Sequence, residues 1–139
     1  MSGLINISEA AVLALHAMIF IAEKSNPMVS TKEIAAAHKA SEAHLAKVMQ
    51  RLAKAGFVSS IRGPKGGFRL AKEPENITLM ELYELFEGTV QENSCLFDYP
   101  VCGRDKCVFG DNIKNINALT IRFLSDTRLS DVVSKPTEK

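Results

Sequence analysis

Two short strand-like runs around a glycine-rich turn constrain the fold of this chain more than any other stretch. The runs cover residues 57–62 and 68–71, and Gly63-Pro64-Lys65-Gly66-Gly67 separates them. Glycine and proline at these positions favour a tight turn, so the two runs are predicted to pair as an antiparallel hairpin. Arg62 and Lys65 lie at the turn, and the hairpin therefore presents positive charge at its tip.

Capping residues and apolar spacing predict three helices before this hairpin. Ser8 begins a helix over residues 9–24, in which apolar residues recur at three- and four-residue spacing. Ser30 begins a short helix to about residue 38, and after a three-residue turn Ser41 begins a third helix to about residue 55. Two helices joined by a tight turn and followed by a basic hairpin are typical of a winged helix-turn-helix.

The second half of the chain begins with a capping box, Thr78 and Glu81, which predicts a helix over residues 79–87. From residue 110 to 125 the apolar side chains fall on one stripe, which predicts a long helix. The earlier helices already supply a core, so we expect this helix to pack on its own copy in a homodimer. Thr127 is expected to begin a last short helix.

These patterns predict a mainly α fold with a small β-hairpin. The predicted divisions are a winged helix-turn-helix DNA-binding domain (1–88), a cysteine loop (89–109), a dimerisation helix with a C-terminal helix (110–134) and a disordered tail (135–139). Hydrophobic residues make up 46% of the chain and charged residues 24%, which is typical of soluble globular proteins. No run of eighteen apolar residues occurs, so we expect no membrane partner and a cytoplasmic location.

The net charge of +1 conceals a strongly basic segment. Residues 39–72 contain eight Lys and Arg residues against one acid, a net charge of +7. A basic block inside a structured segment favours a polyanion partner, here double-stranded DNA. The alternative is an ordinary solvated face of an amphipathic helix.

The second helix of a helix-turn-helix, here about residues 41–55, enters the major groove of DNA. Residues near its N-terminus reach base edges, and further contacts come from outer-face residues one to two turns later. A glutamine such as Gln50 can form two hydrogen bonds with adenine, and an arginine such as Arg51 can form two with guanine. Lys47 is expected to contact a phosphate. The narrow hairpin tip suits a minor groove. The candidate DNA-contacting residues are Ser41, Glu42, His44, Lys47, Gln50, Arg51, Arg62, Lys65 and Arg69.

The three cysteines are Cys95, Cys102 and Cys107, spaced C-x6-C-x4-C. An odd count without a secretion signal favours metal or redox chemistry in a reducing compartment over a disulfide framework. Zinc is the weaker option because the close cysteine pairs of structural zinc sites are missing. An iron–sulphur cluster held by three cysteines and one other ligand fits better. A metal-free thiol switch and inert cysteines are the remaining alternatives.

The three histidines are expected to differ in role. His16 lies within an apolar stretch of the first helix and is expected to be a packed core or interface residue. His38 ends the first helix of the helix-turn-helix, where an imidazole more often interacts with the helix dipole than with a metal. His44 belongs to the predicted DNA face. No nucleophile–base or paired-carboxylate arrangement stands out, so the sequence does not indicate an enzyme.

The order of these motifs resembles the IscR/NsrR group of bacterial regulators, the Rrf2 family. The resemblance rests on residues 59–68, on Ile77-Thr78-Leu79 and on the loop ending Gly103-Arg104-Asp105-Lys106-Cys107, and it covers about residues 5–134. It implies a homodimeric winged-helix transcription factor, usually a repressor, that crosses long C-terminal helices and binds a pseudo-palindromic operator. Many members hold a 2Fe–2S or 4Fe–4S cluster through three cysteines, which match Cys95, Cys102 and Cys107.

The resemblance also bears on the fourth ligand. The histidine and aspartate ligands of two better-known subgroups correspond to Gly110 and Val12 here, so neither is present. A third subgroup uses a histidine that matches His38, which makes His38 the leading candidate. Glu9, Asp111 and His16 are the alternatives.

The predicted function is that of an iron–sulphur cluster-dependent transcriptional regulator, a repressor, that senses redox state, nitric oxide or iron and cluster status. One rival keeps DNA binding and makes the cysteines a metal-free thiol switch. The other is an iron–sulphur protein that does not bind DNA.

Overall fold

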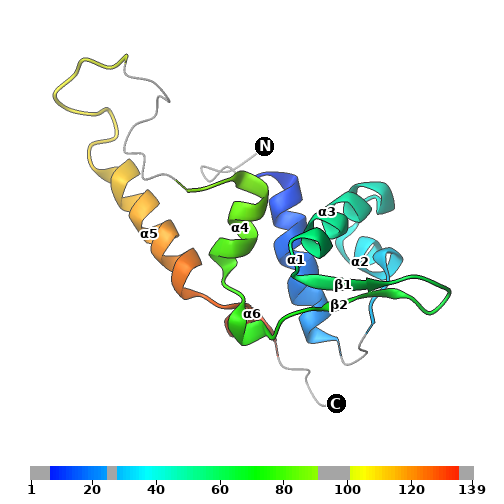
Figure 1. Cartoon of the computed structure of the whole chain (residues 1–139). Helices are drawn as coiled ribbons and strands as arrows, with labels where there is room; N and C mark the ends of the chain where they lie inside the picture. The colour runs from blue at the N-terminus through cyan, green and yellow to red at the C-terminus, as the bar shows by residue number, and fades with distance from the viewer. Residues whose placement is uncertain (1–6, 25–27, 91–100, 135–139) are drawn as a thin grey trace.

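A computed structural model describes residues 7–24, 28–90 and 101–134 of the chain. The predicted disorder of residues 135–139 therefore lies outside the described residues. The described elements are α1 (Glu9–Glu23), α2 (Thr31–His38), α3 (Glu42–Lys54), β1 (Val58–Ile61), β2 (Gly67–Leu70), a 3-10 turn η1 (Pro74–Asn76), α4 (Leu79–Glu87), α5 (Asn112–Asp126) and α6 (Leu129–Val132). The mainly helical fold with a two-strand hairpin is thus confirmed (Figure 1).

The helices begin where their capping residues predict. The hydroxyl oxygens of Ser8, Ser30 and Ser41 each accept a hydrogen bond from the backbone N–H three residues on, at 3.1–3.2 Å. At α4 the box is reciprocal, because Thr78 also donates its backbone N–H to the Glu81 carboxylate. These bonds satisfy backbone donors that a helix end leaves free.

The hairpin is antiparallel, with Val58 paired to Leu70 and Ile61 to Gly67. Its turn depends on glycine, because a Cβ on Gly66 would collide with the Ile61 carbonyl oxygen. A second pairing joins the hairpin to the segment before α2, where Val29 and Phe68 exchange backbone hydrogen bonds at 2.9 and 2.7 Å. The hairpin is therefore held in a fixed place beside the helix-turn-helix.

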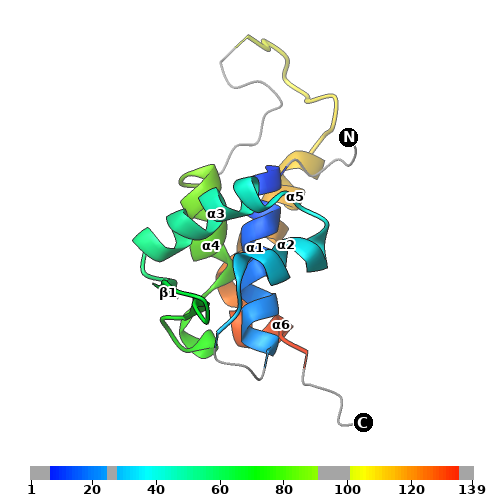
Figure 2. The ribbon, with the colours of Figure 1, turned by 90° about the vertical axis from the view of Figure 1, so that its right-hand side faces the viewer.

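The hydrophobic core surrounds α1, which packs against α2, α3, α4 and α6 (Figures 1 and 2). Met18, Leu45, Met49 and Leu82 are completely buried within it. Helix α5 contributes less to this core, because Leu124 is its one buried residue. Its C-terminal end is joined to the core through a backbone pairing of Thr78 with Arg128.

Two boundaries in the C-terminal part differ from those predicted. Helix α5 begins at Asn112 rather than at residue 110, because Gly110 has a positive φ of 58° and closes a turn onto the Cys107 carbonyl. Helix α6 is capped by Arg128 rather than by Thr127. The carbonyl of Thr127 instead accepts a hydrogen bond from the Leu79 N–H, so this residue forms part of the connection to α4.

Candidate nucleic-acid interface and cysteine loop

Helix α3 has one buried and one exposed face. Its apolar residues Leu45, Val48, Met49 and Leu52 are buried in the core. The predicted DNA-contacting residues lie on the other side, where Ser41, Glu42, Lys47 and Gln50 are exposed and His44 is half-buried. The buried face fixes the helix, and the exposed face is available to a partner.

Arg51 has a different environment from the other predicted DNA-contacting residues of α3. Its Nη2 donates a hydrogen bond to the Leu85 carbonyl oxygen at 2.6 Å, and its guanidinium lies 4.4 Å from the centre of the Phe86 ring. Both partners belong to the end of α4. Arg51 is exposed, as expected for the outer face, but its guanidinium takes part in the contact between α3 and α4.

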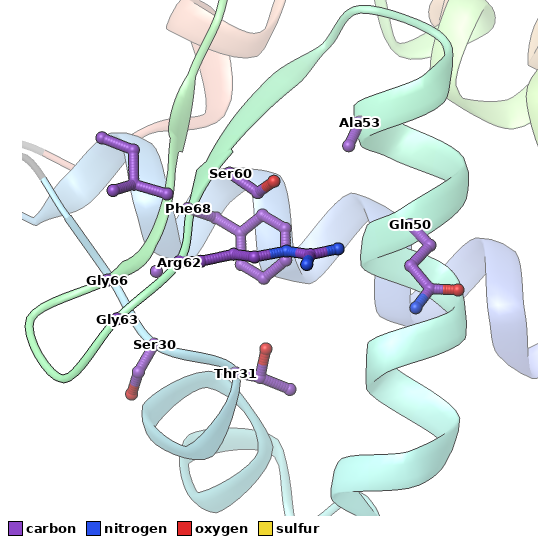
Figure 3. A pocket seen from close by; sticks show the side chains of 11 residues that line it. Ser30, Thr31, Gln50, Ala53, Ser60, Arg62, Gly63, Gly66 and Phe68 are labelled. Carbon is purple, nitrogen blue, oxygen red and sulfur yellow. The ribbon is translucent and has the colours of Figure 1, made fainter.

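The hairpin and α3 enclose a hollow of about 510 Å³ together with the start of α2 (Figure 3). The Arg62 side chain extends from the hairpin across this hollow toward α3, where Gln50 lies. Thr31, at the first position of α2, lines the same hollow, and sequence analysis did not single it out. Its position after the Ser30 cap was the available signal, because helix N-termini attract phosphates.

The remaining hairpin cations, Lys65 and Arg69, are exposed, as is Arg62. Together with Lys47 they give the α3 and hairpin side of the molecule several positive groups that solvent, or a polyanion, can reach.

On α4, burial and the nearby Glu87 carboxylate raise the pKa of Tyr83, so its hydroxyl stays neutral.

Residues 101–111, the described end of the cysteine loop, precede α5 and extend away from the helices of the core (Figures 1 and 2). Cys102 and Cys107 are exposed free thiols, whereas Cys95 lies outside the described residues. Among residues 7–24, 28–90 and 101–134, no group of three His, Cys, Asp or Glu side chains lies close enough to hold a metal. The described part therefore contributes two soft sulphur donors on an open loop.

His16 and His38 lie side by side, with ring centres 6.0 Å apart. Each has Nδ1 at hydrogen-bond distance from a carbonyl oxygen four residues earlier, at 2.7 Å from Val12 and 2.8 Å from Ile34. If Nδ1 donates, Nε2 remains as a ligating atom. His16 was predicted to be a packed core or interface residue, and the core alternative is wrong, since its side chain is exposed; the interface alternative stays a prediction.

The four candidates for a fourth ligand lie in different places. Asp111 directly precedes α5, at the end of the loop that carries Cys107, and it makes no side-chain cap bond. Glu9 is exposed at the start of α1. His16 and His38 lie on α1 and α2, two helices that lie apart from residues 101–111 of the cysteine loop (Figure 1), and no described group of three His, Cys, Asp or Glu side chains includes them.

A capped recognition helix held on a core beside a cation-tipped hairpin defines the winged helix-turn-helix class of DNA-binding regulators. A family model described as Rrf2, iron-dependent transcriptional regulator, matches residues 7–135. The chain therefore belongs to the Rrf2 family of transcriptional regulators, which are not enzymes. The alternative of an iron–sulphur protein that does not bind DNA is replaced by this finding.

Relatives and solved structures agree with this assignment. An HTH-type transcriptional regulator of Aquifex aeolicus is 33% identical over 130 residues, which cover 91% of this chain and 90% of the relative. NsrR of Bacillus licheniformis is 41% identical over 101 residues, which cover 65% of this chain and 68% of that NsrR. The structure of CymR, the global cysteine regulator of B. subtilis, superposes with a TM-score of 0.75 at 30% identity over 93% of this chain and 96% of CymR.

The structure of T. potens IscR superposes with a TM-score of 0.67 at 27% identity, over 91% of this chain and 85% of IscR.

No helix in the described part of the chain has the length and apolar character needed to cross a membrane.

Proposed function

We propose that this chain is a homodimeric repressor that binds operator DNA in the cytoplasm and whose affinity depends on an iron–sulphur cluster. The observation that carries the DNA-binding part is the exposed polar face of α3 beside the fixed basic hairpin. Ser41, Glu42 and His44 would reach base edges in the major groove, with Gln50 further along the helix. The hairpin cations would contact the minor groove and the phosphates.

The dimer is proposed from the apolar surface that the single chain leaves exposed. On α5, the exposed fractions of Ile116, Leu119 and Phe123 are 50%, 68% and 55%. The cysteine loop adds Val108 and Phe109, exposed by 82% and 46%. An apolar stripe of this size on one helix is typical of a contact with another protein, here a second copy of the chain.

Cys95, Cys102 and Cys107 are the proposed cysteine ligands of a 2Fe–2S or 4Fe–4S cluster. The two described thiols fit this role, because both are exposed on one open loop and thiolates are the usual ligands of such clusters. When bound, the cluster would supply a group whose oxidation, nitrosylation or loss alters the loop. The loop connects α4 of the DNA-binding part with α5 of the proposed dimer contact.

His38 is the proposed fourth ligand, and the structure adds a condition to this proposal. His38 ends α2, and α2 lies apart from residues 101–111, the described end of the cysteine loop, so an imidazole ligand for Cys102 and Cys107 would come from the second copy in the dimer. The Nδ1 contact with Ile34 fixes the ring and would leave Nε2 to bind iron. Asp111 needs no second copy and is the principal rival.

Native mass spectrometry of protein purified without oxygen tests the cluster and the dimer together. We expect a dimer with one cluster per chain, whose mass gives the cluster type. A dimer without iron after reconstitution with iron and sulphide would overturn the cluster. His38→Gln should reduce iron content while Asp111→Asn retains it, and the reverse pattern would assign the ligand to Asp111.

DNA binding is tested by selecting duplexes from a random-sequence library with the purified protein. We expect enrichment of a pseudo-palindromic sequence and tighter binding by the cluster-loaded protein than by the apo protein. Failure to enrich any duplex would overturn the DNA-binding proposal, and equal affinities would overturn its dependence on the cluster.

A thiol switch is the second candidate, because Cys102 and Cys107 are exposed and free to oxidise. A solved structure of Staphylococcus aureus CymR, 25% identical, is described as an oxidised form. The visible absorption spectrum of anaerobically purified protein separates the two candidates. A colourless protein whose duplex affinity changes on oxidation would favour the thiol switch.

A further inference from the structure

A second hollow, of about 470 Å³, lies on another side of α3 from the hairpin. Its walls come from α3, the start of α1 and the end of α4. The lining residues are Ala10, Ala43, His44, Lys47, Val48, Arg51 and Phe86. Its volume lies in the range of pockets that hold small molecules.

The lining combines apolar walls with positive charge. Four lining residues are apolar, among them the aromatic ring of Phe86, and three are basic: His44, Lys47 and Arg51. Among the residues that the structure describes, no acidic side chain lines the hollow. An apolar ligand alone would leave the charges of Lys47 and Arg51 without an anionic partner in the hollow, and a bare inorganic anion would leave the apolar walls uncovered. An anion with an apolar body satisfies both.

Arg51 is held in position before any ligand arrives. One of its five N–H donors is bound to the Leu85 carbonyl at 2.6 Å, and its plane is held against Phe86. The remaining donors can bind a carboxylate, for which the planar guanidinium is well suited. The walls are also tied together, since the Ser8 N–H donates to Glu87 Oε1 at 2.8 Å and joins α1 to α4. Such preorganisation lowers the cost of binding.

We propose that this hollow binds a small aromatic carboxylate, with its ring near Phe86 and its carboxylate between Lys47 and Arg51. Ligand binding itself does not depend on the proposed function. Its consequence does, because Lys47 and His44 also belong to the DNA-contacting face of α3. A bound carboxylate would neutralise Lys47 and thereby weaken binding of DNA.

Fluorine NMR of 4-fluorophenylacetate with the full-length protein tests the site. We expect saturable binding that weakens about tenfold or more in Lys47→Gln, which removes a charge partner. Ala43→Leu should weaken it similarly by filling the hollow. Lys54→Gln is the matched control, since Lys54 is an exposed lysine of the same helix and does not line the hollow.

Several results would overturn the site. These are the absence of saturable binding, equal binding of the neutral 2-(4-fluorophenyl)ethanol, equally effective displacement by inorganic phosphate, and binding that Ala43→Leu leaves unchanged. Ligand binding without any loss of affinity for the selected duplex would overturn the regulatory effect. Failure of the protein to bind any duplex would count against the proposed function and not against the ligand site.

Discussion

At the scale of single residues, Arg51 shows how a cation on a recognition helix can have a structural partner. It lies on the same helix as Lys47 and Gln50, yet its guanidinium is bound to the carbonyl of Leu85 and to the ring of Phe86. The contact connects the recognition helix with α4, and through α4 with the cysteine loop. Arg51 therefore has a role in positioning α3.

Arg51→Ala is expected to lower the free energy of unfolding by about 1 kcal/mol, from the loss of one charged hydrogen bond and one exposed cation–π contact. Sequence discrimination should persist, and Gln50→Ala should reduce it without loss of stability. Urea denaturation and competition between matched and mismatched duplexes measure the two effects. An Arg51→Ala protein of unchanged stability that no longer discriminates would contradict this role.

The hairpin cations should behave differently, because they are exposed and lie near a predicted phosphate path. The double variant Arg62→Ala/Lys65→Ala is expected to weaken binding to all duplexes and to reduce the slope of log affinity against log salt by about two. Affinity measured at four or five salt concentrations gives this slope. A variant with the parental slope would exclude the hairpin from the interface.

Four helix caps that act through neighbours in sequence were predicted correctly, whereas Thr127, predicted to cap the last helix, bonds across the fold to Leu79 instead. Ser8, Ser30, Ser41 and Thr78 cap helices through bonds three residues away, which a sequence pattern contains. Arg51 finds its partner 34 residues later, and no local pattern indicates that distance. The exposure of His16 likewise depends on which faces of α1 the other helices cover.

At the scale of elements, the hairpin depends on its glycines. Gly66→Ala would force a Cβ against the Ile61 carbonyl, so we expect a distorted turn and weakened duplex binding while the helical content is retained. Gly103→Ala is the control, because a Cβ there meets no atom within 4 Å and its φ is not positive; all variants are compared as apo protein, since Gly103 follows the proposed ligand Cys102. Circular dichroism and duplex titration are the measurements; normal DNA binding by Gly66→Ala would show that the turn adapts.

Helix α5 was predicted from its apolar stripe, and the structure leaves much of that stripe uncovered. Leu119, the most exposed of its large hydrophobic residues, is the point at which to test the dimer. Leu119→Glu is expected to give a folded monomer, because it puts a charge into the proposed contact and leaves the α1 core untouched. Light scattering after gel filtration measures the mass, with Lys114→Glu as the control. A dimeric Leu119→Glu protein would move the contact elsewhere.

At the scale of the whole molecule, the order of modules could be predicted and their placement could not. Caps, periodicity and cysteine spacing are local, and they give the sequence of helix-turn-helix, hairpin, loop and long helix. That residues 101–111 extend away from α1 and α2 depends on how α5 returns to the core at Arg128, which is a long-range contact. Which residue could serve as the proposed fourth ligand depends on the same geometry.

The backbone pairing of Thr78 with Arg128 can act as a hinge between α4 and α5. The pairing joins the start of α4 to the end of α5, and the cysteine loop begins and ends at their opposite tips. Helix α5 has 15 residues, a lever of about 22 Å. A rotation of about 10° at this pivot would move the far tip by about 4 Å, more than the rise of one DNA base pair. In the proposed dimer, where α5 would form the contact between the two copies, such a rotation would change the separation of the two α3 helices relative to the DNA half-sites.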